Sequence, residues 1–160
     1  MTEPDGLPAQ LAELVEEFAA LSEPDRLQLL LEFSRGLPAL PARLADHPDL
    51  LEPVPECQSP IFLTVEVTPA ATGAGVVNLF FQAPQEAPTT RGFAGVLHAG
   101  LDGLAVAEVL GVPDDLPHLL GLDRAITPLR LRGMSGMLAR IKRQVREKAA
   151  LQARPQDQPS

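Results

Sequence analysis

The chain has no tryptophan or tyrosine, only one cysteine and only three histidines among its 160 residues. One sulfur cannot form an internal disulfide or supply the four thiolates of an iron-sulfur cluster. The histidines, at positions 47, 98 and 118, show neither HxxxH nor HExxH spacing, so the sequence has no familiar zinc motif. It also lacks the GxxxxGK, GxSxG and strand-to-helix GxGxxG motifs. These absences argue against most metal, nucleotide and serine-hydrolase chemistry.

Long hydrophobic runs are also missing. No apolar run approaches the roughly 18 residues of a membrane-spanning helix, and the first ten residues are acidic where a secretory signal is basic. The length suits one compact domain, and 45% hydrophobic with 21% charged residues is close to the globular average. We therefore expect a single domain over residues 1–151, a disordered tail over 152–160, a cytoplasmic location and no membrane partner.

Charge is unevenly distributed along the chain. The net charge of −8 and the absence of Trp and Tyr argue against nucleic acid as a partner. Residues 1–56 hold twelve acidic residues and three Arg, whereas residues 121–154 hold nine Lys or Arg and two acidic residues. One interpretation is that a basic C-terminal helix packs beside acidic N-terminal helices. The alternative is a basic face that docks a partner.

Hydrophobic periodicity predicts helices at the N-terminal end of the chain. Apolar residues recur at helical spacing over residues 7–21, and a second helix is expected to begin after Ser22 as its cap and to end before Gly36. Five prolines follow between residues 37 and 56, and we expect this stretch to form an ordered surface loop.

The middle of the chain predicts strands. Residues 61–67 read IFLTVEV, with alternating apolar residues, and residues 76–82 follow as a partner strand. The glycines of the intervening ATGAG favour a tight connection, so we expect an antiparallel hairpin.

Further helices are predicted in the second half of the chain. Thr89 or Thr90 is expected to cap a helix that turns Phe93 and Leu97 inward, with short helices near residues 105–110 and 114–120. The last helix should begin at Thr127 and run to about residue 151. The predicted class is α+β, with a small antiparallel sheet of two to three strands and about five to six helices.

The lone cysteine, Cys57 in VPECQSPIFL, lies where the proline-rich stretch meets the first long strand. Taken alone, it is either a buried, inert residue or a reactive thiol, and its polar neighbours favour the second interpretation. A catalytic pair with one of the three histidines stays open at this point.

Three segments carry a resemblance to a known family. Residues 57–59 (Cys57-Gln58-Ser59) follow a proline-rich loop, Arg91-Gly92-Phe93 opens the middle helix, and residues 122–133 read LDRAITPLRLRG. In order and spacing they resemble the V-x-G-C-Q-S, R/K-G-L and L-x-x-x-L-(S/T)-P-x-R-x-x-G segments of the SufE family, over about residues 8–148. The chain departs from that pattern at Glu56, which replaces Gly, at Pro60, and at residues 84–87, where PQEA replaces D-S-D-A.

The resemblance implies a SufE/IscU-like fold and a sulfur carrier rather than an enzyme, with no metal or cofactor of its own. Cys57 would accept persulfide sulfur from a SufS-like cysteine desulfurase, which holds the pyridoxal phosphate, and pass it to a downstream recipient or cluster scaffold for iron-sulfur cluster assembly. The residues implied around the sulfur site or partner surface are Gln58, Ser59, Glu86, Arg91 and Arg130. The competing interpretation is a non-catalytic binding or scaffold module in which Cys57 is structural.

The loop that carries the cysteine has to meet two opposing demands if this resemblance holds. Burial protects a persulfide but raises a thiol pKa, whereas transfer requires an accessible thiolate. We therefore expect Cys57 to be mostly buried in the free protein, near Leu63 or neighbouring apolar residues, and the loop over residues 53–60 to open on the partner.

Overall fold

Seven α-helices and a three-stranded antiparallel sheet make up the part of the chain that the computed structural model describes, residues 7–57, 59–69 and 75–153. This arrangement confirms the predicted α+β class. In chain order the elements are α1 (Ala9–Ala19), α2 (Glu23–Arg35), α3 (Ala42–Ala45), the 3-10 turn η1 (Pro48–Leu50), β1 (Glu52–Pro53), β2 (Phe62–Thr68), β3 (Val76–Gln82), α4 (Pro88–Leu101), α5 (Val106–Leu110), α6 (Leu116–Leu119) and α7 (Pro128–Ala153).

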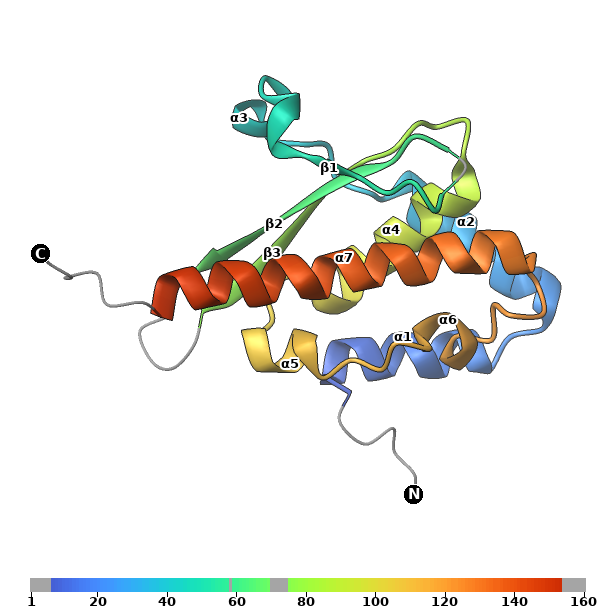
Figure 1. Cartoon of the computed structure of the whole chain (residues 1–160). Coiled ribbons are helices and arrows are strands. Elements are labelled where there is room, and N and C mark those ends of the chain that lie inside the picture. The colour runs from blue at the N-terminus through green and yellow to red at the C-terminus, as the bar shows by residue number, and fades with distance from the viewer. Residues whose placement is uncertain (1–6, 58, 70–74, 154–160) are drawn as a thin grey trace, which may run out of the picture.

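The elements form layers. The strands lie in the order β1-β2-β3, with α7 against β2 and α4 against β3. On the other side, α1 and α2 pack on α4, while α5 and α6 pack on α7. Figure 1 shows the long α7 crossing the molecule with the sheet on one side and α1, α5 and α6 on the other. The two central helices are therefore covered on both sides.

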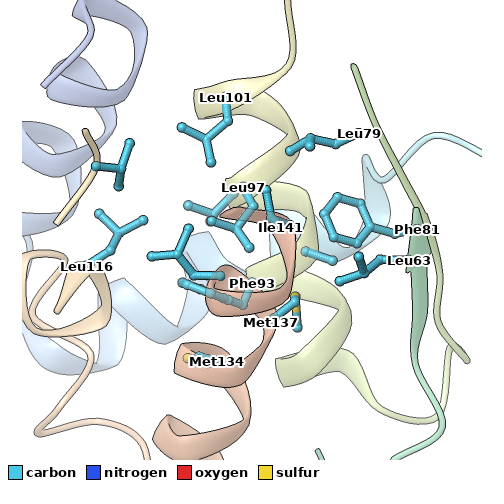
Figure 2. Packing of buried hydrophobic residues seen from close by; sticks show 14 of the residues in the cluster. Leu63, Leu79, Phe81, Phe93, Leu97, Leu101, Leu116, Met134, Met137 and Ile141 are labelled. Carbon is cyan, nitrogen blue, oxygen red and sulfur yellow. The ribbon is translucent and has the colours of Figure 1, made fainter. Parts of the chain in front are cut away.

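The core lies where α4, α7 and the sheet meet. Figure 2 shows Phe93 and Leu97 of α4 beside Met137 and Ile141 of α7, facing the side chains of the strands. The inward orientation predicted for the middle helix is confirmed, because Phe93 and Leu97 are fully buried. The labelled strand residues, also buried, are Leu63, Leu79 and Phe81.

The predicted hairpin is present. Strands β2 and β3 pair antiparallel from Phe62 with Gln82 to Thr68 with Val76, and the connection over residues 70–74 lies outside the described residues. On its other edge β2 pairs with β1 only at Leu63 and Phe62.

Side chains of α7 cover the rest of that edge of β2. The Val65 N–H donates to Oε1 of Gln144 at 2.8 Å, Lys148 donates to the Val65 carbonyl, and Gln152 donates to the Val67 carbonyl. These bonds satisfy backbone groups that an open sheet edge leaves free for pairing with another chain.

Two of the three predicted helix caps are confirmed. The hydroxyl of Ser22 accepts from the Asp25 N–H at 3.4 Å, and Oγ1 of Thr127 accepts from the Arg130 N–H at 3.3 Å. The cap predicted at Thr89 or Thr90 is wrong, because α4 begins one residue earlier at Pro88 and has no side-chain cap. Proline suits a first helical position since its fixed φ is already helical.

The segment over residues 37–56 is more regular than the predicted loop. It holds α3, η1 and the short strand β1, with Pro41 directly before α3 and Pro48 opening η1. The prolines therefore begin helical turns here in addition to interrupting the chain.

The basic C-terminal helix does not pack beside the acidic N-terminal helices, so the first interpretation of the charge distribution is wrong. Helices α1 and α2 pack against α4. Within the described residues, the ion pairs of α7 go to Glu52, Glu56, Asp114 and Glu147. Helix packing places α4 between α7 and the two N-terminal helices, so the carboxylates of the acidic region that reach α7 are Glu52 and Glu56, which follow those helices in the chain.

The C-terminal helix α7 extends to Ala153, slightly past the expected end, and residues 154–160 lie outside the described residues. Within the described ranges, no helix combines the length and the apolar character needed to cross a membrane.

Candidate functional site

Cys57 lies on the loop between β1 and β2, where this loop rests on α7. The Cys57 N–H donates to the carbonyl of Val54 at 3.0 Å, which closes a tight turn just after β1. Its side chain is half-buried and packs against the edge of the core, so it is less enclosed than we predicted.

A small pocket of about 40 Å³ opens beside the Cys57 side chain. The first turn of α4 and the first turns of α7 complete it. Its lining residues are Cys57, Ser59, Thr89, Thr90, Arg130, Met134 and Met137. The structure thus brings together three of the residues that the sequence singled out, Cys57, Ser59 and Arg130. We expected Leu63 or neighbouring apolar residues here; Leu63 does not line the pocket, and its apolar lining comes from two methionines of α7, Met134 and Met137.

Two glycines of α7 allow the cysteine loop to lie directly on the helix. A Cβ atom on Gly133 would lie 2.8 Å from Sγ of Cys57, and one on Gly136 would lie 2.9 Å from Cδ of Glu56. Real Cβ atoms do not approach other heavy atoms to less than 3.0 Å, so a side chain at position 133 has to shift Cys57, whose Cα would also lie only 3.1 Å away, and a side chain at position 136 has to displace the Glu56 side chain. The spacing of three residues puts both glycines on one helix face.

Charged groups fasten the same loop one turn further along α7. Nη1 of Arg140 contacts Oε1 of Glu56 at 2.7 Å, and Nε of Arg140 lies 3.2 Å from Oε2 of Glu52. Glu52 is also paired with Arg143 and accepts from Nε2 of Gln144 at 2.8 Å. The two carboxylates that precede Cys57 in the chain are therefore both attached to α7.

Burial raises the pKa of the Cys57 thiol to about 11. The negative charge of Glu56 is the second contribution to this value, and the positive charge of Arg140 offsets part of the rise. Near neutral pH the resting site therefore holds a protonated thiol, which is a poor nucleophile. The pKa of Glu56 is lowered by a hydrogen bond to its carboxylate from its own backbone and by the hydrogen bond from Arg140, so this carboxyl is ionised.

The other predicted site residues lie elsewhere or outside the described residues. Arg91 donates from Nε to the Ser34 carbonyl at 2.8 Å and from Nη1 to the Ala83 carbonyl at 2.7 Å, and it borders a separate cavity of about 430 Å³. Glu86 is exposed on the loop before α4. Gln58 lies outside the described residues. Roles for these three in sulfur transfer or partner binding stay predictions.

None of the three histidines lines the Cys57 pocket. His118 pairs with Asp123 at 3.0 Å, and His98 lies 3.8 Å from Asp102. The described residues also contain no group of three or more potential ligands placed to hold a metal ion. The pocket lining therefore gives no support to the cysteine–histidine pair that the sequence left open.

Comparison with known proteins identifies the family. The family model of SufE, described as an Fe-S metabolism associated domain, matches residues 12–145. The chain belongs to the SufE family. Uncharacterized SufE-like proteins from two strains of Mycobacterium tuberculosis are 57% identical to it over 147 residues, which is 92% of this chain and 99% of theirs. SufE-like protein 1, chloroplastic/mitochondrial, of Arabidopsis thaliana is 27% identical over 133 residues, 82% of this chain and 33% of that protein.

A solved structure supports the fold independently. The solution structure of a hypothetical protein from Thermus thermophilus matches with a TM-score of 0.77 and 38% identity, covering 90% of this chain and 98% of that one. Membership of the SufE family assigns the chain a role in iron-sulfur metabolism.

Packing also explains the Arg91-Gly92-Phe93 motif, one of the three segments that resemble other SufE proteins. In Arg91-Gly92-Phe93, Phe93 is fully buried in the core and Arg91 ties α4 to α2 through the Ser34 carbonyl. A Cβ on Gly92 would lie 2.4 Å from the Leu30 carbonyl oxygen, so glycine is needed for the close approach of α2. This motif joins two helices rather than entering the Cys57 pocket.

Several residues of this SufE site are not predicted by the sequence patterns. The patterns indicate a helix cap at Thr89 or Thr90, and they assign no role to Met137, Gly136 or Arg140. The signal that points to the loop contact is GMSGM over residues 133–137, because a G-x-x-G pair inside an amphipathic helix is costly unless something packs closely on it.

Proposed function

We propose that this SufE-family protein is a sulfur acceptor and carrier for iron-sulfur cluster assembly, with Cys57 as the accepting residue. The Cys57 thiolate attacks the outer sulfur of a cysteine persulfide on a SufS-like desulfurase. A disulfide bond forms between Cys57 and that sulfur, the bond between the two desulfurase sulfurs breaks, and the desulfurase thiolate leaves. A downstream recipient or cluster scaffold then takes the outer sulfur from Cys57 in a second exchange. In this proposal both steps occur in the cytoplasm.

The observation that carries the proposal is the pocket beside the only cysteine. Its volume of about 40 Å³ exceeds the roughly 10 to 15 Å³ that a cavity needs to hold one water molecule, so there is room for an extra heavy atom such as sulfur. The methionine side chains give that atom a soft, apolar surface. Arg130 supplies a cation in the pocket lining, which favours an anionic persulfide.

The resting thiol is protonated, so we expect sulfur transfer to Cys57 only after the loop moves. A thiol with a pKa of about 11 has little thiolate near neutral pH, so free Cys57 reacts slowly and a stored persulfide is sheltered. Moving the loop into a partner's site removes the burial that raises this pKa. We expect faster alkylation of Cys57 by iodoacetamide in the presence of a desulfurase that lacks its own reactive cysteine.

Mass spectrometry tests the proposal directly. The protein is incubated anaerobically with a cysteine desulfurase and L-cysteine, and the wild-type chain should gain about 32 Da, the mass of one sulfur, on the peptide that carries Cys57. A wild-type chain that stays unmodified while the desulfurase is active would contradict the proposal.

Visible absorption after anaerobic addition of iron and sulfide tests the competing scaffold role, for which a bound cluster would be the positive result.

A further inference from the structure

The cysteine turn is joined to α7 by an ion pair whose acidic member is the residue next to Cys57. Glu56 contacts Arg140 at 2.7 Å, and the carboxylate of Glu56 lies over Gly136, where a Cβ would approach it to 2.9 Å. Cys57 itself lies over Gly133. Three positions of α7, each one turn from the next, thus hold two consecutive residues of the turn.

Arg140 is placed so that release of Glu56 does not leave it without a counter-ion. It is largely buried, with 20% of its side chain exposed, and Nε lies 3.2 Å from Glu52. Glu52 is held independently by Arg143 and Gln144. A buried cation that loses its only partner is strongly destabilised, whereas Arg140 keeps one carboxylate when the turn lifts. The pair is therefore suited to breaking and re-forming.

We propose that the ion pair between Glu56 and Arg140 is the clamp that keeps Cys57 in its pocket, and that both are positioning residues for sulfur acceptance. The inference rests on the proposed function for the role it gives Cys57. A desulfurase that docks here has to separate Glu56 from Arg140 before the turn can carry Cys57 outward. The family pattern has glycine before the cysteine, so the clamp is a property of chains that carry an acidic residue at this position.

If Arg140 acts on Cys57 only through its charge, its loss should change the alkylation rate in the opposite direction from the loss of a clamp, so the proposal can be tested. The charged groups around Cys57 are Glu56 on its own turn, Glu52 on β1, and Arg130 and Arg140 on α7, while α4 contributes the uncharged Thr89 and Thr90. If Arg140 acted only as a nearby cation, its loss would favour the protonated thiol and slow alkylation. If it holds the turn down, its loss exposes Cys57 and speeds alkylation.

The experiment measures iodoacetamide alkylation of Cys57 in the full chain without any partner, at fixed pH. We expect Glu56→Gln and Arg140→Gln each to alkylate about fivefold faster than wild type, the factor for an ion pair worth about 1 kcal/mol. Combining them should add little, because both break the same contact. The thiol pKa, followed by thiolate absorbance, should fall more in Glu56→Gln than in Arg140→Gln, since only the first removes a negative charge.

Glu147→Gln is the matched control. It breaks the exposed pair between Arg143 and Glu147 on the same helix and should leave the alkylation rate unchanged. Thermal unfolding of every variant confirms that it is folded. Slower or unchanged alkylation of folded Arg140→Gln would overturn the clamp, and so would additive effects in the double variant. Sulfur loading of the wild-type chain by a desulfurase is scored separately, so failure of the proposed function is distinguished from failure of the clamp.

Discussion

Cys57 lies directly on Gly133: a Cβ atom at that glycine would be 2.8 Å from Sγ and 3.1 Å from Cα of the cysteine. The second distance matters more, because a side chain can rotate away while a backbone atom moves only with its loop. The resting position of the cysteine is therefore set by the absence of a side chain on α7.

Gly133→Ala should displace the cysteine turn and speed alkylation of Cys57 in the free protein. The new methyl group meets Sγ and Cα of Cys57, so the turn has to shift outward. Overall stability should change little, because alanine gains about 1 kcal/mol of helix propensity over glycine and this offsets lost packing. Ser135→Ala, at an exposed position of α7, is the control for helix propensity. An alkylation rate equal to that of wild type would show that the contact does not position the turn.

Cys57→Ser should leave the fold intact and abolish sulfur acceptance. Serine has nearly the volume of cysteine, but its hydroxyl cannot hold a persulfide. Circular dichroism checks the fold, and intact-mass analysis after incubation with a desulfurase and cysteine checks acceptance. Sulfur still bound covalently by this variant would show that another residue is the acceptor.

Arg130→Ala should fold normally and accept sulfur more slowly. Arg130 lines the pocket, whereas its contribution to the cap of α7 is a backbone N–H that the substitution keeps. Arg132→Ala is the matched control, because Arg132 is an exposed neighbour that does not line the pocket. The measurement is single-turnover transfer from a persulfidated desulfurase. Equal transfer rates for the two variants would show that Arg130 does not contribute to sulfur acceptance.

Stability should fall at alkaline pH because of Cys57. Burial raises the folded-state pKa of this thiol to about 11, whereas a thiol in an unfolded chain titrates near about 8.5. Since the folded-state pKa is the higher one, the contribution of the protonated thiol is complete below about pH 8.5 and is lost as the pH rises through the folded-state value. Urea unfolding at about pH 8 and about pH 10.5 should show a larger loss for wild type than for Cys57→Ser. Equal losses of stability in wild type and Cys57→Ser would contradict the burial of the Cys57 thiol.

Gln144→Ala should lower the free energy of unfolding by about 1 to 3 kcal/mol, the usual cost of leaving a buried polar group without its partner. Oε1 of Gln144 accepts the Val65 N–H at the edge of β2, and Gln144 is itself buried. Arg146→Ala, at an exposed position on the same helix, is the control. Equal midpoints in urea for both variants would show that the edge of β2 is satisfied in another way.

The sequence by itself determined the local elements and the family. Helical and strand periodicity located α2, β3 and α7 closely, because burial of one face repeats every 3.6 or 2 residues and is visible within a short window. The segment around Cys57 and the TPLRLRG stretch identified the family for the same reason, since both are contiguous in the chain.

Only the tertiary structure decided which side chains meet. Glu56 and Arg140 are 84 residues apart, and Arg91 reaches a carbonyl 57 residues away, so no local pattern records either contact. Periodicity shows that a helix face is buried but not what covers it. The glycine face of α7, the clamp of Glu56 and the raised pKa of Cys57 all follow from that covering, because each depends on how closely the cysteine turn packs against α7.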